Sequence, residues 1–168
     1  MKTINRFRAL ALLLFASLAK AQDPTLPSVS ARQIFVAEGR GVQIYQCTGQ
    51  NGMFTWTFQS PEATLFEPAT QHALGKHGAG PSWTWTDGSA ISGKFLQKSP
   101  SPDLGSIPWL LLSTAPSGTT TGALTPITLV RRSDTHGGNA PAAGCDAEHI
   151  SAVIRIAYSA TYTFYIAQ

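Results

Sequence analysis

The sequence predicts an all-β fold, either a β-sandwich or a Greek-key barrel, with about ten short strands. Apolar and polar residues alternate along several segments, which is typical of strands with one buried face. Turn-forming residues recur about every 8–12 residues, and no segment after residue 21 has apolar residues at helical spacing. These patterns favour a single all-β domain over residues 22–168.

The first two predicted strands cover residues 33–37 and 42–48. The Glu-Gly-Arg-Gly segment at residues 38–41 separates them, and we interpret it as a hairpin turn because glycine readily adopts positive φ. A second turn is predicted at residues 49–52, which contain two glycines.

Aromatic residues mark the next strands. Residues 54–59 and 82–86 carry Phe or Trp at alternate positions, so that these side chains share one face of each strand. Asp87-Gly88 follows directly and is a strong type I′ turn signal. Residues 89–97 are then the partner strand, with a bend or bulge at Gly93.

The second half of the chain continues the pattern. Residues 109–114 form an apolar strand that we expect to be buried on both faces, and residues 127–132 form another strand. The longest predicted loop is the Gly-, Pro- and Ala-rich segment 136–144. From residue 154 to 166, apolar side chains keep one parity, which predicts one bent strand or two strands that meet near Ala160.

Residues 1–21 have the three parts of a secretory signal peptide. Three basic residues precede a short apolar run, and Ala19-Lys20-Ala21 supplies small residues around a cleavage site. The apolar run is shorter than the roughly 20 residues that cross a bilayer, so we expect no stable membrane insertion. The mature chain is expected to start near Gln22 and to be secreted or periplasmic.

The charge balance argues against nucleic acid as a partner. Four of the twelve Lys and Arg residues lie within the predicted signal peptide, so the rest of the chain carries eight basic and nine acidic residues, a formal charge of −1. Nucleic-acid binders need clustered basic residues, whereas here Arg131-Arg132 is the one adjacent basic pair of the mature chain.

Cys47 and Cys145 are the two cysteines of the chain, and an isolated pair in an exported protein is most simply one disulfide. A bond that closes a loop of roughly 100 residues stabilises the fold by about 4–5 kcal/mol in the chain-entropy view. We interpret it as structural, since no C-x-x-C spacing suggests redox chemistry.

The sequence lacks the common catalytic motifs. There is no Gly-x-Ser-x-Gly segment and no P-loop, and the glycines at residues 39–41 lie between two predicted strands, so we expect no nucleotide cofactor. His77, Asp87, Asp134 and His136 are the side chains that could converge on a metal ion. Because the histidine spacing does not put two ligands on one strand face, we expect no metal site.

Two sets of residues suggest carbohydrate recognition or cleavage, and each has a simpler interpretation. The four Trp residues offer apolar faces on which sugar rings could stack, but we interpret them as core residues, since Trp56, Trp83 and Trp85 keep the parity of the neighbouring apolar positions. Trp109, which follows a proline-rich loop, is the one we expect nearest the surface. Glu62, Glu67 and Asp87 could supply the carboxyl pair of a glycosidase. Nothing in their spacing brings two together, so we interpret them as isolated solvated groups.

Six segments carry a resemblance to a known family: residues 36–47, 60–65, 75–83, 87–89, 107–112 and 137–146. Together they resemble a secreted family known as domain of unknown function 3455. The resemblance covers nearly all of the mature chain and implies no particular activity. The family pattern singles out His77, Gly80, Pro81, Trp83, Asp87 and the two cysteines. We therefore take His77, Gly80, Trp83 and Asp87, together with Trp109, as candidate binding residues.

Three shorter stretches, residues 79–81, 103–107 and 138–140, are similar to segments of copper/zinc superoxide dismutases, which are Greek-key β-sandwiches. The His-x-His copper pair of that family is absent, and Ser82 stands where a bridging histidine would follow. This fainter resemblance implies a related fold and disulfide without dismutase chemistry.

Two functional hypotheses follow. The first is a secreted or periplasmic, disulfide-stapled β-domain that is not catalytic and binds a small molecule, a glycan or a protein, or associates with the cell envelope. The alternative is an extracellular enzyme, either a hydrolase or metal-dependent, centred on His77 and Asp87. The sequence leaves the ligand and the oligomeric state open.

Overall fold

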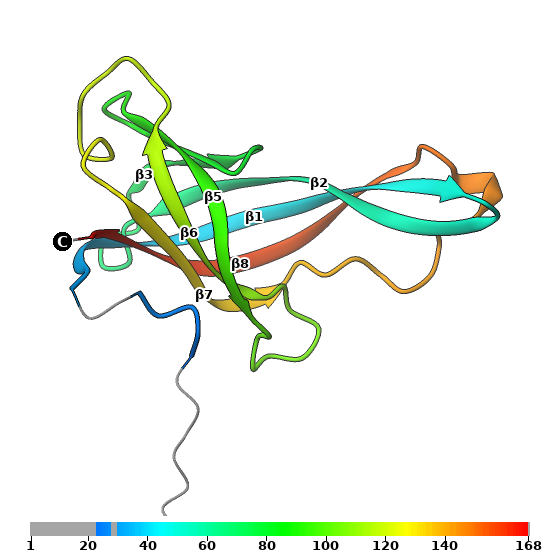
Figure 1. Ribbon diagram of the computed structural model, residues 1–168. Coiled ribbons are helices and arrows are strands. Elements are labelled where there is room, and N and C mark those ends of the chain that lie inside the picture. The colour runs from blue at the N-terminus through cyan, green and yellow to red at the C-terminus, as the bar shows by residue number, and fades with distance from the viewer. Residues whose placement is uncertain (1–22, 28–29, 168) are drawn as a thin grey trace, which may run out of the picture.

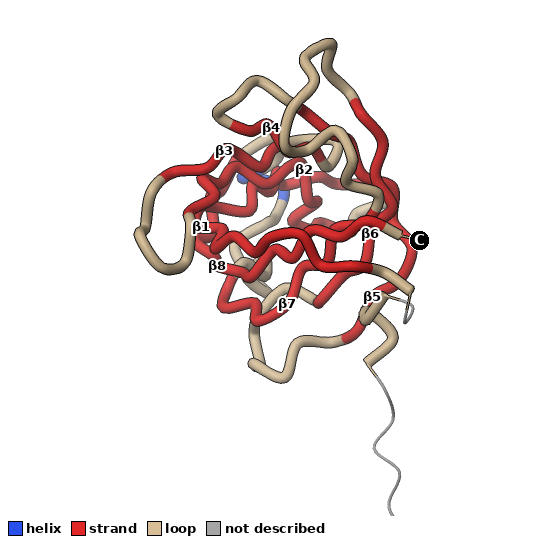
Figure 2. Tube along the Cα trace, turned by 90° about the vertical axis from the view of Figure 1, so that its left-hand side faces the viewer, coloured by secondary structure: helices blue, strands red, loops and turns tan. Residues whose placement is uncertain are grey.

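The computed structural model describes residues 23–27 and 30–167. Its strands are β1 (Arg32–Gln50), β2 (Met53–Phe66), β3 (Ala73–Gly78), β4 (Ser82–Trp85), β5 (Ala90–Ser99), β6 (Trp109–Pro116), β7 (Leu129–Gly137) and β8 (Val153–Ile166), and a short 3₁₀ turn, η1 (Ala147–His149), precedes β8. Each strand pairs antiparallel with the next along the chain, and β8 pairs with β1. The result is a closed barrel, seen in Figures 1 and 2.

The predicted all-β fold with one disulfide is confirmed. The observed topology differs from both predicted alternatives, the β-sandwich and the Greek-key barrel, because strands that are neighbours in the barrel are also consecutive in sequence. The described strands therefore form an up-and-down barrel, with neither a Greek-key crossover nor two separate sheets. Eight strands form it, fewer than the expected ten or so, partly because β1 is one strand where the sequence predicts two.

The predicted hairpin turn at residues 38–41 is wrong, because β1 runs straight through this segment. A Cβ atom on Gly39 would lie 2.5 Å from Cε2 of Tyr162. On Gly41 it would lie 2.0 Å from the carbonyl oxygen of Glu62. Gly39 thus leaves room for the ring of Tyr162, and Gly41 lets the backbone of β2 come close to β1. A glycine that is needed for such close packing within a strand looks the same in the sequence as a glycine in a turn.

The two other predicted turns are present. Asn51 and Gly52 connect β1 to β2 with positive φ angles of 52° and 77°. In the turn after β4, the Trp85 N–H donates to the Ser89 carbonyl (2.8 Å), and the Gly88 N–H donates to the Trp85 carbonyl (3.0 Å). Gly88 has a φ of 86°. This is a three-residue connection with one left-handed glycine, and it replaces the predicted type I′ turn.

The alternation predicted for the C-terminal segment is confirmed, and β8 is one strand. Its inward residues join the core, whose buried members are Ala37, Ala63, Leu65, Trp83, Ile91, Ile107, Leu112, Leu124, Ile127, Val130, Tyr158, Ala160, Tyr162 and Phe164. In β6, the adjacent residues Leu111 and Leu112 are both buried, as the apolar segment predicted. Inward side chains from all around the barrel therefore form its core.

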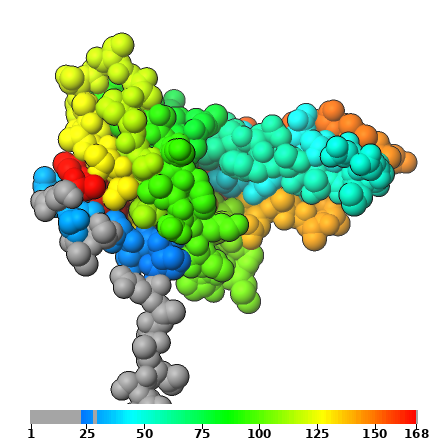
Figure 3. All heavy atoms as spheres, viewed as in Figure 1, coloured from blue at the N-terminus to red at the C-terminus, as the bar shows by residue number. Residues whose placement is uncertain are grey.

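Three strands extend beyond the barrel as a long arm (Figures 1 and 3). In the registers, β2 pairs with β3 only from Ala63 onward, and β8 pairs with β7 only from Tyr158 onward. The preceding parts of β2 and β8 pair with the second half of β1 alone. We call residues 44–60 and 153–157 the three-stranded ribbon.

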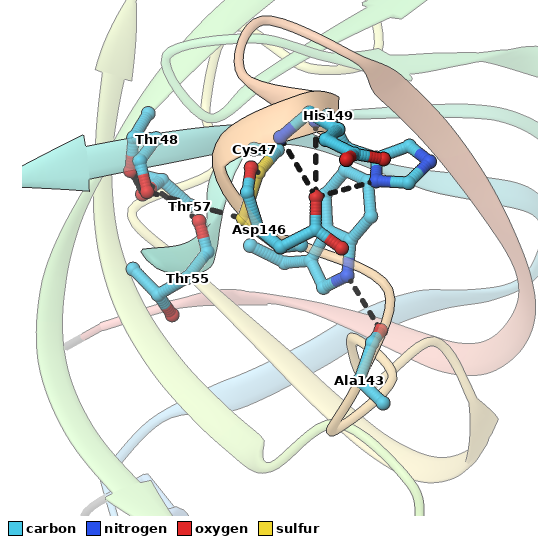
Figure 4. The surroundings of a disulfide bond; sticks show 10 residues. Cys47, Thr48, Thr55, Thr57, Ala143, Asp146 and His149 are labelled. Carbon is cyan, nitrogen blue, oxygen red and sulfur yellow. Dashed lines mark hydrogen bonds and ion pairs between the residues drawn. A yellow bond between two sulfur atoms is a disulfide. The ribbon is translucent and has the colours of Figure 1, made fainter. Parts of the chain in front are cut away.

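The disulfide between Cys47 and Cys145 fastens the loop after β7 to this ribbon, with a Cα–Cα distance of 5.3 Å. Figure 4 shows its surroundings. Beside it, the indole N–H of Trp56 donates to the carbonyl of Ala143 at 3.0 Å. Asp146 accepts from the backbone of η1, including the N–H of His149 at 3.2 Å. The long Gly- and Pro-rich loop is thus held at its far end.

The predicted signal peptide, residues 1–21, lies outside the described residues. Within the described ranges, no helix has the length and apolar character that crossing a membrane requires.

Candidate functional site

A cavity of about 370 Å³ reaches into the barrel. Its lining comes from every strand except β1 and from the β3–β4 turn, namely Phe58, Gln59, Pro61, His77, Gly80, Pro81, Trp83, Phe95, Leu110, Leu112, Arg132 and Tyr162. Phe58 and Phe95 are 49% and 54% exposed and lie toward solvent. Cavities of this size in barrel mouths, with apolar walls and a few polar groups, are typical small-ligand sites.

His77 lies on the wall formed by the β3–β4 hairpin. Gly80, with a φ of 103°, allows the tight connection that pairs His77 with Trp83 across the two strands. The two rings stack at 4.8 Å between centroids and 15° between planes. Nδ1 of His77 lies 2.9 Å from the Ser82 carbonyl oxygen. Since a carbonyl accepts only, Nδ1 carries the proton and Nε2 is an acceptor in the neutral ring.

The imidazole is uncharged at neutral pH. His77 is 4% exposed, and burial lowers its pKa to about 4, with the positive charge of Arg132 acting in the same direction. The hydrogen bond to Ser82 opposes this decrease. His77 therefore contributes a polar but neutral edge to the cavity.

Arg132 brings the positive charge. It lies on β7 opposite Leu110 of β6 and Tyr162 of β8, and it is 9% exposed. Its Nε and Nη2 donate to the Pro108 carbonyl at 3.2 and 2.8 Å. Within residues 23–27 and 30–167, the carboxylate ion pairs involve other basic residues and none reaches Arg132.

Two tyrosines complete the polar part of the interior. The hydroxyl groups of Tyr158 and Tyr162 lie 3.0 Å apart and share a hydrogen bond. Burial raises the pKa of both phenols, while the positive charge of Arg132 opposes the increase. Both tyrosines therefore stay protonated near neutral pH and supply no negative charge to balance the guanidinium.

The structure brings three of the five candidate binding residues together: His77, Gly80 and Trp83 line the same cavity. Asp87 and Trp109 are not part of its lining. Trp109 packs under the guanidinium of Arg131, whose Cζ lies 5.1 Å from the indole centroid. Arg131 in turn pairs with Asp23 at 2.8 Å. Trp109 thus belongs to the contact between β6, β7 and the segment 23–27.

Asp87 organises the turn after β4. Its carboxylate accepts hydrogen bonds from the Ala123 N–H (2.8 Å), the Ser89 N–H (2.8 Å) and the Ser89 hydroxyl (2.6 Å). These bonds, led by the one from Ala123, hold the pKa of Asp87 below its usual range. They connect the β4–β5 turn to the loop between β6 and β7.

The remaining residues considered for metal or glycosidase chemistry lie apart. Asp134 and His136 line a separate pocket of about 220 Å³, and His136 pairs with Asp103 at 2.9 Å. Glu62 pairs with Arg155 at 2.7 Å. In the part of the chain that the structure describes, no group of three or more His, Cys, Asp or Glu residues is arranged for a metal ion.

Sequence reasoning missed Arg132, Tyr162 and Phe95 as cavity residues. The sequence contains a hint of the role of Arg132. It lies two residues after Val130, so its side chain is on the same, buried face of the strand, where an arginine is unusual. Tyr162 was assigned to the buried face of its strand, but its contact with the cavity depends on how the barrel closes.

Comparison with known proteins identifies the family. The family model described as "Protein of unknown function (DUF3455)" matches residues 27–166. No curated protein and no solved structure matches the sequence. The similarity to copper/zinc superoxide dismutases is not shown, and the up-and-down order of the described strands differs from the Greek-key sandwich that it implies.

Proposed function

Since the chain belongs to the DUF3455 family, whose description names no activity, we propose from its structure that the protein is a binding module. It is exported, stabilised by one disulfide, and holds a small, largely apolar ligand in the barrel cavity. The observation that carries this proposal is the cavity of about 370 Å³, which is lined mainly by apolar side chains.

Two features support an exported module. The basic, apolar and small-residue parts of the first 21 residues follow the order of a secretory signal peptide. The Cys47–Cys145 disulfide fits an oxidising compartment, where such bonds form and persist. We therefore place the mature protein, beginning near Gln22, outside the cell or in the periplasm.

The binding role is favoured over the enzyme alternative by the arrangement of His77 and Asp87. A catalytic histidine is commonly oriented by a carboxylate, whereas Nδ1 of His77 donates to the backbone carbonyl of Ser82. The Asp87 carboxylate is occupied by the turn after β4. No observation favours a specific reaction, so binding is the function that we propose.

A fluorescent apolar probe tests this proposal. N-phenyl-1-naphthylamine is neutral and becomes fluorescent in apolar surroundings, so titration of the mature protein is expected to give saturable binding at one site. Leu110 lines the cavity, and Leu110→Trp is expected to fill it and to weaken probe binding at least tenfold. The control is Leu104→Trp, at a leucine that is 94% exposed and outside the cavity lining.

Circular dichroism and the thermal transition establish that both variants are folded. Binding that does not saturate, or equal affinity of folded Leu110→Trp and Leu104→Trp proteins, would show that the cavity is not the site. Weaker binding by Leu110→Trp alone supports the proposal.

A further inference from the structure

The cavity contains one charge that no carboxylate among the described residues balances. Of the lining residues, Arg132 alone is charged at neutral pH, because His77 is neutral and the remaining lining side chains are apolar, amide or phenolic. Arg132 is 9% exposed, and no carboxylate among the described residues pairs with it. Burying a guanidinium without a counter-ion is unfavourable. An anion that enters the cavity therefore lowers this cost by pairing with Arg132.

The guanidinium has hydrogen-bonding capacity to spare. Its Nε and Nη2 donate to the Pro108 carbonyl oxygen, and a further hydrogen bond links the guanidinium to the Tyr162 hydroxyl, which leaves N–H donors for a ligand. A guanidinium has five N–H donors in a planar fork, which suits the two oxygens of a carboxylate. The bonds to Pro108 also fix the orientation of the side chain before a ligand arrives, which reduces the entropy lost on binding.

The rest of the lining selects the body of the ligand. Phe58 and Phe95 lie at the solvent side, and Leu112 and Trp83 lie deeper, where both are buried. A molecule that reaches Arg132 from solvent therefore passes along aromatic and aliphatic surface. An apolar body is favoured there because it removes this surface and its own from water.

We infer that the ligand is an apolar monocarboxylic acid, whose carboxylate binds the guanidinium of Arg132 while its hydrocarbon part lies along Phe58, Phe95 and Leu112. One positive charge selects one negative charge, since a dianion such as a phosphate monoester would leave a net negative charge in an apolar cavity. The inference rests on the proposed binding function and specifies the ligand class for the same cavity.

Octanoate, 1-octanol and octyl phosphate are the probes, since they share one chain and differ in the head group. Displacement of N-phenyl-1-naphthylamine from the mature protein, at pH 7.5 and low salt, measures each affinity. Octanoate is expected to bind about ten- to a hundredfold more tightly than 1-octanol, the range for hydrogen bonds between charged groups. It is also expected to bind more tightly than octyl phosphate.

Two arginine variants assign the effect to one residue. Arg132→Gln is expected to reduce octanoate affinity to that of 1-octanol while leaving 1-octanol affinity within about twofold. Arg131→Gln is the matched control, because Arg131 is the adjacent arginine and pairs with Asp23 away from the cavity. It should keep the wild-type preference for octanoate. Arg132→Lys, which keeps the charge but loses the planar fork, should retain part of that preference.

The outcomes separate the inference from the function on which it rests. If the dye itself does not bind, the proposed binding function fails. If the dye binds and octanoate does not displace it, the binding function stands and the carboxylate inference is overturned. If 1-octanol displaces the dye as well as octanoate does, or if octyl phosphate binds most tightly, the cavity binds ligands but the carboxylate inference is overturned. If Arg132→Gln does not fold, the order of affinities for octanoate, 1-octanol and octyl phosphate is compared between the wild type and Arg132→Lys. A preference for octanoate that is weaker in Arg132→Lys supports the carboxylate inference, and an equal preference in both contradicts it.

Discussion

Acidification should destabilise this protein through one buried histidine. His77 is 4% exposed, donates from Nδ1 to the Ser82 carbonyl, and stacks on Trp83. Its pKa is lowered from 6.5 to about 4 by burial and by the charge of Arg132. In the unfolded chain the imidazole takes up a proton below about pH 6.5, whereas in the folded protein it does so only near pH 4.

The sign and size of the effect follow from this difference. Between these two pH values the unfolded state binds more protons, so the free energy of unfolding falls as the pH decreases. The contribution of His77 is fully present above pH 6.5 and is lost by about pH 4. A decrease in pKa of this size corresponds to about 3 kcal/mol over that range.

Urea unfolding followed by tryptophan fluorescence between pH 7.5 and 4.0 measures this loss. His77→Gln lowers stability at every pH, but its stability should decline about 3 kcal/mol less than that of the wild type across the range. His72→Gln, at an exposed histidine, is the control and should follow the wild type. Parallel pH profiles for the wild type and His77→Gln would refute the reasoning.

Three further predictions concern the frame around the cavity. Replacing Cys47 and Cys145 with Ala should cost about 4–5 kcal/mol of stability in the chain-entropy view and lower the thermal midpoint by about 10–20 °C, measured by calorimetry without reductant; an unchanged midpoint would contradict this. Gly41→Ala should destabilise by about 1–3 kcal/mol or more in urea, because its Cβ meets backbone of β2, whereas Gly118→Ala, with its nearest contact at 3.4 Å, should be tolerated. Asp87→Ala should increase hydrogen exchange and proteolysis in the loop between β6 and β7, and protection equal to that of the wild type would show that the carboxylate does not hold this loop.

The strand periodicity could be predicted from the sequence because it depends on local side-chain patterns. The disulfide could be predicted because its formation depends on the redox state of the compartment, which the first 21 residues suggest. The alternation from residue 154 to 166 reflects the two-residue repeat of any strand with one buried face, and it is present in β8. The pairing of Cys47 with Cys145 required only that an exported chain with two cysteines forms one bond.

The candidate site was predicted only in part. His77 and Trp83 were candidates because the family resemblance singles them out, and they lie together because a tight glycine turn joins their two strands. Asp87 is also near in sequence, but the next turn directs its carboxylate to Ser89 and Ala123 instead of the cavity. The resemblance therefore identified one hairpin of the cavity wall and did not identify the opposite wall.

The sequence by itself determined that the chain forms strands, which faces of them are apolar, and where the glycine turns at residues 52 and 88 lie, because these follow from local side-chain patterns and backbone preferences. Only the tertiary structure decided that β8 closes on β1, and that Gly39 and Gly41 serve close packing. The same closure places Arg132 beside Tyr162 and opposite the β3–β4 hairpin. Barrel closure depends on the register and tilt of strands far apart in sequence, and no local pattern encodes these.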